Sequence, residues 1–260
     1  MHGVELAYID AGEGPVVLFL HGFPFDKSMW NDQVEALTAA GFRIVAPDLR
    51  GLGETTVGGE VSTMEDMARD AAALLDDLRI DEAVVCGLSL GGYVAFEFVH
   101  LFPARVRGLV LAGTRAPADN EQEKAAREQQ VQTMLRAGMV PISIATLPKL
   151  LAERTRSAKP DVVKRVRTMI TGSTPKGASA AQRGMAERRD YSADLPHIDT
   201  PTLIIVGRED SIRPVSDAEF MHERIPNSQL EIIEDAAHMT NLEQAEEFNR
   251  IVVEFLQSIH

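Results

Sequence analysis

The chain has 260 residues, of which 45% are apolar, and its formal net charge is −13 at pH 7. This length fits one large α/β domain with a sizeable core and room for an insertion. The negative charge argues against nucleic acid and anionic membranes as partners. The one cysteine, Cys86, excludes an intrachain disulfide and gives no indication of an oxidising compartment.

The sequence pattern predicts neither a targeting segment nor a membrane-spanning segment. The first residues contain no basic segment followed by an apolar one, so we expect no signal peptide. No apolar run approaches the roughly 20 residues that a membrane-spanning helix needs. We therefore expect a cytoplasmic protein that does not bind membranes.

Strand and helix patterns alternate along most of the chain. We predict strands over 16–20, 43–46, 83–86, 108–112, 201–206 and 229–233, with an early strand drawn from 4–9. We predict helices over 30–40, 63–78, 93–101 and 241–257. The strand runs are apolar throughout, which indicates a mostly parallel central sheet with helices on both faces. Catalytic groups should then lie at the carboxyl ends of the strands.

Residues 116–190 interrupt this alternation, with helical patterns over 121–137 and 161–170 and no convincing strand. We predict a core domain of residues 1–115 and 191–260, with the interrupting segment folded over the sheet as a helical cap. Between Arg115 and Asp190 there are 15 Lys and Arg against 8 Asp and Glu, while the remainder holds 11 against 31. Two solvated surfaces of different composition explain this asymmetry. A basic cap that favours anionic substrates is the alternative.

The predicted cap carries more apolar side chains than a loop needs. Most of them should pack the cap helices against one another. Methionine is frequent among them, and its flexible thioether suits an adaptable pocket wall. Our candidate substrate-binding residues are Met134, Met139, Ile142 and Leu147.

Residues 87–92 read Gly-Leu-Ser-Leu-Gly-Gly and follow a predicted buried strand. A strand, a G-x-S-x-G turn and a helix pattern form the sequence signature of a nucleophile elbow. The turn is so tight that the residues two before and two after Ser89 must be nearly free of side chains, as Gly87 and Gly91 are. The Ser89 hydroxyl can then attack an acyl carbon if a base and an acid lie nearby.

A neutral serine is a poor nucleophile and needs a base. Among the seven histidines, His238 follows a predicted strand by a short loop and precedes a helix. His21 also ends a strand, but Gly22 follows it at once. His238 is therefore the predicted base, and the alternative is a capping or surface histidine.

The base in turn needs an acid that orients it. Asp210 and Glu209 both lie just beyond a predicted strand, and adjacent residues face different ways, so only one should reach the base. We favour Asp210, with Glu209, Asp235 and Glu243 as lesser candidates.

The oxyanion of an acyl-transfer reaction needs two backbone N–H donors. Leu90 follows the nucleophile at a helix N-terminus, where the helix dipole also favours negative charge. The second donor should come from the loop after the first buried strand, and Phe23 is the most plausible residue there.

With these residues in place, the chain resembles a cap-bearing α/β-hydrolase over nearly its whole length. The resemblance implies the α/β-hydrolase fold, a Ser89–Asp210–His238 triad in the family's chain order, and Phe23 and Leu90 as oxyanion donors. The chain departs from the family's usual pattern in two respects. It has Thr55 where serine is common, and we expect it to lack the usual first strand. The landmarks are His21-Gly22-Phe23-Pro24, Pro47-Asp48-Leu49-Arg50-Gly51-Leu52-Gly53, the elbow, Phe102-Pro103-Ala104-Arg105-Val106, Gly207-Arg208-Glu209-Asp210 and Ala237-His238.

The serine at the elbow separates this chain from haloalkane dehalogenases and epoxide hydrolases, which use aspartate there. Similar groups include carboxylesterases, enol-lactone hydrolases, cofactor-free haloperoxidases, carbon–carbon bond hydrolases and thioesterases. The Phe-Pro loop and compact cap look most like small-molecule esterases and lactonases. The resemblance thus implies hydrolysis of a small ester or lactone through an acyl-enzyme, with no metal or cofactor. A triad-bearing small-molecule receptor with slow turnover and an acyltransferase are alternatives, and the oligomeric state stays open.

Overall fold

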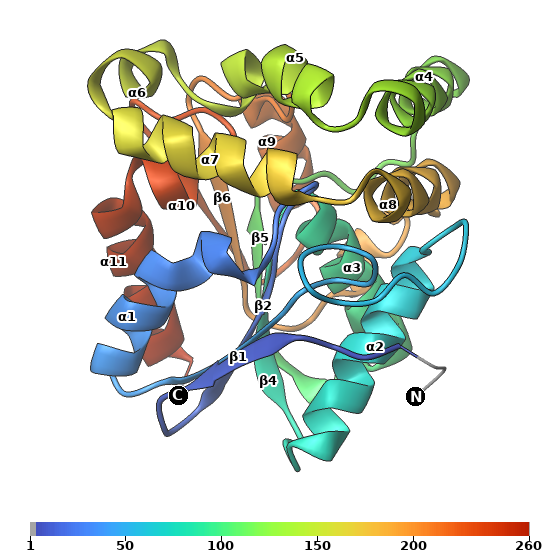
Figure 1. Cartoon of the computed structure of the whole chain (residues 1–260). Helices are drawn as coiled ribbons and strands as arrows, with labels where there is room; N and C mark the ends of the chain where they lie inside the picture. Colours follow the sequence, from blue (N-terminus) through green and yellow to red (C-terminus); the bar gives the residue numbers. More distant parts are fainter. Residues whose placement is uncertain (1–3, 260) are drawn as a thin grey trace.

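The computed structural model describes residues 4–259, which form a central sheet with helices on both sides (Figure 1). The sheet has seven strands in the order β1-β3-β2-β4-β5-β6-β7. All neighbouring strands are parallel except β1, which runs antiparallel to β3. The predicted mostly parallel sheet is confirmed. The strands are β1 (Tyr8–Ala11), β2 (Val16–Leu20), β3 (Arg43–Pro47), β4 (Ala83–Leu88), β5 (Val106–Ala112), β6 (Thr202–Gly207) and β7 (Ser228–Ile233).

Helices α1 (Asn31–Ala39) and α11 (Ala245–Ser258) lie on one side of the sheet, and α2 (Met64–Asp77) and α3 (Leu90–Leu101) lie on the other (Figure 1). Burial on both faces explains why the central strands are apolar along their whole length. Helix α9 (Val215–His222) joins β6 to β7. Short 3-10 helices cover Lys27–Trp30, Pro103–Arg105 and Leu195–His197.

Local capping chemistry fixes where α2 begins. Thr63 is the N-cap residue, because its hydroxyl accepts from the Asp66 amide while the Asp66 carboxylate accepts from the Thr63 amide. Such a reciprocal capping box satisfies two backbone donors that a helix start leaves unpaired. Within residues 4–259, no helix combines the length and the apolar character needed to cross a bilayer.

Five further helices lie between β5 and β6 in the chain and cover the carboxyl ends of the strands (Figure 1). Helix α4 begins and ends where the pattern over 121–137 predicts, and α7 extends the predicted 161–170 at both ends. The boundaries 116 and 190 for a separate cap stay a prediction. The five are α4 (Glu121–Ala137), α5 (Val140–Leu150), α6 (Glu153–Ala158), α7 (Pro160–Gly172) and α8 (Pro175–Glu187).

The prediction of one closing helix over 241–257 is wrong. The segment forms α10 (Thr240–Glu243) and α11, separated by Gln244, whose φ of −129° and ψ of 59° lie outside the helical region. The Glu243 carbonyl accepts from the Lys159 ammonium of the cap at 2.5 Å, instead of continuing a helical ladder. The break between α10 and α11 thus lies at a contact with Lys159, which precedes α7.

Candidate active site

Ser89 lies at the turn between β4 and α3, in an unusual backbone conformation. Its φ is 55° and its ψ is −108°, a combination that costs a non-glycine residue on the order of 1–3 kcal/mol. Two hydrogen bonds hold it there: its amide donates to the Ala112 carbonyl at 2.9 Å, and the Thr114 hydroxyl donates to its carbonyl at 2.9 Å. The neighbouring strand β5 thus maintains the strained turn that presents the serine.

The glycines around Ser89 are required by close backbone contacts. A Cβ atom at Gly91 would lie 1.9 Å from the Leu20 carbonyl oxygen, and one at Gly87 would lie 2.2 Å from the Gly91 carbonyl oxygen. Neither backbone neighbour can move aside as a flexible side chain could. The sequence requirement for glycine two residues before and two after the serine therefore has a direct steric cause.

His238 and Asp210 form a buried pair at the ends of the two last strands. The His238 Nδ1 lies 2.7 Å from Asp210 Oδ2, and the amides of Ile212 and Arg213 donate to Asp210 Oδ1 at 2.8 and 2.9 Å. Burial raises the pKa of Asp210, but the charge and hydrogen bond of His238 and these two amides outweigh it, so the pKa is lowered. Because an ionised carboxylate only accepts, Nδ1 carries the proton and Nε2 is left as the basic nitrogen.

The other three acid candidates do not contact His238. Glu209 is exposed, and Asp235 pairs with Arg154. Glu243 is fully buried, and its two carboxylate oxygens accept from the Ala152 and Ala237 amides. Among the four carboxylates that the sequence singles out, only Asp210 meets the predicted base.

Glu243 instead connects two segments of the structure, a role that the sequence analysis missed. Its carboxylate accepts from the Ala237 amide at 2.8 Å and from the Ala152 amide at 2.7 Å. Ala237 immediately precedes His238, and Ala152 lies between the cap helices α5 and α6. Burial raises the pKa of Glu243, and hydrogen bonds from Thr155 and the two amides offset part of this effect. This carboxylate joins the loop that carries His238 to the cap.

A cavity of about 470 Å³ lies between the core and the cap, and both Ser89 and His238 line it. Phe23 and Pro24 line it from the loop after β2. The other residues around it come from α3, from the segment just before α4, from the loop after β6 and from α4, α5 and α8 of the cap. These are Tyr93, Asp119, Glu123, Ala126, Arg127, Gln130, Ala145, Thr146, Lys149, Leu150, Gln182, Met185, Ser211, Ile212 and Arg213.

The two predicted oxyanion donors flank the elbow. Leu90 is the first residue of α3, and Phe23 lines the cavity from the loop after β2. In the part of the chain that the structure describes, neither amide N–H has a protein hydrogen-bond partner. Both donors are therefore available, and their role in catalysis stays a prediction.

The four predicted substrate-binding residues lie elsewhere. Met134, Met139, Ile142 and Leu147 are buried in the hydrophobic core, and none of them is among the residues around the cavity. Helix α4 packs against α8 and α5 packs against α7, so that these side chains face other helices. Their contact with substrate stays a prediction without support from the cavity lining.

Charged side chains line much of the cavity on the side formed by the cap, which we call the cap wall. Asp119 is buried and pairs with Arg127 and, at 2.8 Å each, with Arg115 and Arg188. Burial raises the pKa of Asp119, but the guanidinium groups of Arg127 and Arg188 outweigh it and hold the pKa well below its usual range. The excess of basic residues in the predicted cap was the sequence signal for this network.

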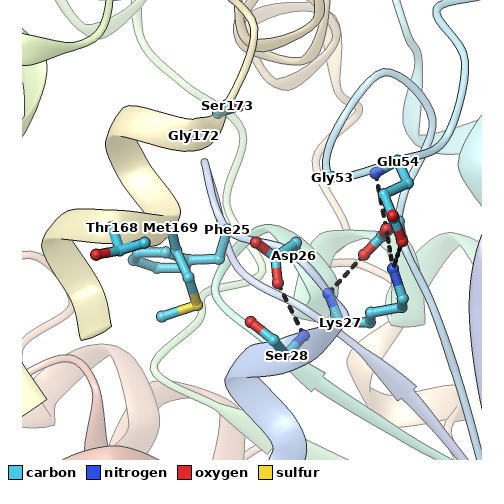
Figure 2. Close-up of a pocket in the computed structure, with 11 residues that line it drawn as sticks. Phe25, Asp26, Lys27, Ser28, Gly53, Glu54, Thr168, Met169, Gly172 and Ser173 are labelled. Carbon is cyan, nitrogen blue, oxygen red and sulfur yellow. Dashed lines mark hydrogen bonds and ion pairs between the residues drawn. The ribbon is translucent and has the colours of Figure 1, made fainter.

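A second cavity, of about 410 Å³, lies between α7 and the loop after β2 (Figure 2). Lys27 crosses one side of it, with its ammonium 2.8 Å from Asp48 and 2.5 Å from Glu54. Neither Ser89 nor His238 lines this space. It therefore lacks the predicted nucleophile and the predicted base, which line the first cavity.

Comparison with known proteins identifies the architecture. Residues 15–245 match the model of the α/β-hydrolase fold family. The chain is 30% identical to 3-oxoadipate enol-lactonase 1 of Acinetobacter baylyi, over 94% of this chain and 90% of that protein. It is 41% identical to a thermophilic esterase from Thermogutta terrifontis solved with malate bound, with a TM-score of 0.97 over 99% of this chain and 94% of that one.

A third relative, the enol-lactonase from Burkholderia xenovorans, is 27% identical, with a TM-score of 0.92 over 98% of this chain and 97% of that one. Esterase and enol-lactonase are both names of hydrolases. The match covers the sheet, the elbow and the cap, and the predicted family resemblance is confirmed. The chain belongs to the α/β-hydrolase fold family.

Proposed function

We propose that this protein is a serine hydrolase that cleaves a small-molecule carboxylic ester or lactone with Ser89, His238 and Asp210. The observation that carries the proposal is the 2.7 Å bond between His238 Nδ1 and Asp210 Oδ2, because it aims the basic nitrogen of a cavity-lining histidine away from the carboxylate. Ser89 lines the same cavity. Nucleophile, base and acid are the parts that acyl transfer requires.

The reaction proceeds in two steps. His238 Nε2 accepts the Ser89 proton as the hydroxyl oxygen attacks the carbonyl carbon, and the amides of Phe23 and Leu90 stabilise the oxyanion. The carbonyl re-forms, the alcohol leaves, and it takes the proton from His238. Water then repeats the sequence on the acyl-enzyme and releases the acid, which restores the serine.

Asp210 supports both steps without being protonated itself. It holds the imidazole in one tautomer and stabilises the imidazolium that forms when the serine proton is accepted. The two amides on Oδ1 fix the carboxylate, so that the imidazole orientation is set before substrate binds.

The cavity and the relatives support a small substrate. A volume of about 470 Å³ fits a compact ester rather than a polymer segment. Among the similar proteins, one is named an esterase and two are named enol-lactonases. These names describe the hydrolysis of a carboxylic ester or a lactone. In a lactone the leaving alcohol stays attached to the acyl group, and the same residues perform the reaction.

Labelling with a fluorophosphonate probe and turnover of p-nitrophenyl acetate and butyrate test the proposal together. Ser89→Ala should abolish labelling and lower turnover about 10⁴-fold or more, with the melting temperature preserved. Ser216→Ala, which removes an exposed serine on α9, is the matched control and should behave as the parent protein. Undiminished turnover in the Ser89 variant would remove this serine as the nucleophile.

A further inference from the structure

A guanidinium group lies beside the catalytic pair without a carboxylate of its own. Arg213 lines the Ser89 cavity, and its backbone amide donates to Asp210. Within residues 4–259 its side chain forms no ion pair. Asp217, on the adjacent α9, feels its charge but is not paired with it.

Tyr93 holds this guanidinium in place. The phenol oxygen accepts from Arg213 Nε at 3.0 Å and from Nη2 at 2.6 Å, and the Ile212 carbonyl accepts from Nη1 at 2.6 Å. Tyr93 is itself buried, four residues after Ser89 on α3. A guanidinium has five N–H donors, and these bonds use three of them. One N–H on Nη1 and one on Nη2 remain for another acceptor.

The acidic residues of the cavity are already paired with other arginines. Asp119 pairs with Arg115, Arg127 and Arg188, and Glu123 pairs with Arg115 at 2.7 Å. Neither carboxylate is therefore free to neutralise Arg213.

A second cation at the cavity is also unpaired. Lys149 lines it from α5, is exposed, and forms no ion pair with any described residue. The whole chain has a net charge of −13, so two unpaired cations at one cavity form a local excess of positive charge.

We propose that Arg213, held by Tyr93 and assisted by Lys149, binds a carboxylate group carried by the ester or lactone substrate. This inference rests on the proposed hydrolase function and names its substrate class: an ester or lactone with a second, ionised carboxyl group. A carboxylate can accept from Nη1 and Nη2 together, an arrangement that arginine favours. Partial exposure of Arg213 leaves these donors accessible from the cavity.

The arrangement also explains why Tyr93 is buried among cations. The Arg188 guanidinium lies 4.1 Å from the centre of its ring. Burial raises the pKa of the phenol, but the charges of Arg213, Arg188 and Arg127 outweigh it, so the pKa is lowered. The Tyr93 oxygen accepts two hydrogen bonds from Arg213 and so fixes the guanidinium, whereas a carboxylate at that position would also neutralise its charge.

The test compares each anionic ester with its neutral amide analogue of the same shape. Acyl-side pairs are monoethyl succinate, glutarate and adipate against the corresponding monoamide ethyl esters. Alcohol-side pairs are 4-acetoxybutanoate against 4-acetoxybutanamide. Hydrolysis is followed by proton NMR, and the readout is the ratio of kcat/KM within each pair.

The parent protein should prefer the anionic member in at least one series. Arg213→Gln should lower that preference about tenfold to a hundredfold, which corresponds to one or two lost charge-assisted hydrogen bonds, because kcat/KM for the anionic ester falls by that factor more than kcat/KM for the neutral analogue. Arg213→Lys should recover part of the preference, because it keeps the charge but loses the planar fork. Tyr93→Phe should reduce the preference by a smaller factor.

Arg208→Gln is the matched control. Arg208 lies on the same loop after β6, is exposed, and pairs with Glu234 outside the cavity. Its loss changes the net charge by the same amount as Arg213→Gln and should leave the preference unchanged.

The outcomes separate the two proposals. If Ser89-dependent hydrolysis occurs but both members of every pair react equally, or if Arg213→Gln slows both equally, the carboxylate site is wrong and the hydrolase remains. If no ester or lactone is hydrolysed and no fluorophosphonate label attaches, the hydrolase proposal itself fails, and this inference falls with it.

Discussion

The two walls of the active-site cavity are held together in different ways. On the core wall, backbone groups set the positions: the Ser89 turn is bonded to β5, and amides fix the Asp210 carboxylate. On the cap wall, long side chains hold one another, with Asp119 at the centre of three arginines. Reaction geometry thus depends on the path of the chain, while the shape and charge of the cap wall depend on individual side chains that one substitution can change.

The largest expected effect is on the core wall, and it concerns rate. Asp210→Asn should lower kcat about 10⁴-fold, because an amide favours the wrong imidazole tautomer. The adjacent Glu209→Gln removes the same charge from an exposed position and is the matched control. Comparable losses in both variants would contradict the assignment of the acid. Steady-state kinetics with p-nitrophenyl butyrate provides the measurement.

On the cap wall, we expect a substitution to change the free energy of unfolding. Asp119→Asn leaves three guanidinium groups without their shared carboxylate, which should lower the free energy of unfolding by about 3–5 kcal/mol. Glu121→Gln, at an exposed position in the first turn of α4, should cost less than about 1 kcal/mol. Urea denaturation at pH 7 measures both. A loss in Asp119→Asn no larger than in its control would show that the network does not stabilise the cap.

The contact between the walls should give an intermediate effect. Glu243→Gln places an amide NH₂ against one of two backbone N–H donors, at Ala237 or Ala152, and leaves that donor unsatisfied. We expect a loss of about 1–3 kcal/mol in unfolding free energy. Hydrogen exchange at these two amides should accelerate. Unchanged protection at both would show that the carboxylate does not couple cap and core.

The smallest effect is the acid dependence of stability. The pKa values of Asp119 and Asp210 are lowered from 3.8, so the unfolded chain binds their protons first as the pH falls. Each group's contribution is complete above its unfolded pKa and is lost as the pH falls through the folded pKa, at no more than about 1.4 kcal/mol per pH unit. Thermal unfolding between pH 2.5 and 5.5 should show a shallower slope in Asp119→Asn. Parallel slopes would contradict the lowered pKa of Asp119.

The core side of the site could be predicted from sequence because its constraints are local. The elbow glycines are adjacent to Ser89, and Asp210 and His238 each follow a recognisable strand by a few residues. Parallel strands bring such loops to one edge of the sheet without further information. The alternation of side-chain directions also predicted that only one of Asp210 and Glu209 would reach the base, without deciding which of the two.

The cap side could not be predicted in the same way. The limits of α4 are visible as a capping box at Asn120 and a glycine at Gly138, but its rotation about its own axis depends on packing against α8. That rotation directs Met134 into the core and leaves Arg127 at the cavity. The pairing of Asp119 with Arg188 joins residues far apart in the chain, and no periodicity reveals it.

The contact of Gly91 with the Leu20 carbonyl has a consequence for how such a protein can be re-engineered. Because a methyl group does not fit there, the spacing between the end of β2 and the start of α3 cannot be adjusted by small increments through side-chain volume. Directed evolution toward a bulkier or differently charged substrate should therefore accumulate its productive changes in α4, α5 and α8. The strand exits that carry Phe23 and Ser89 should stay unaltered through successive rounds.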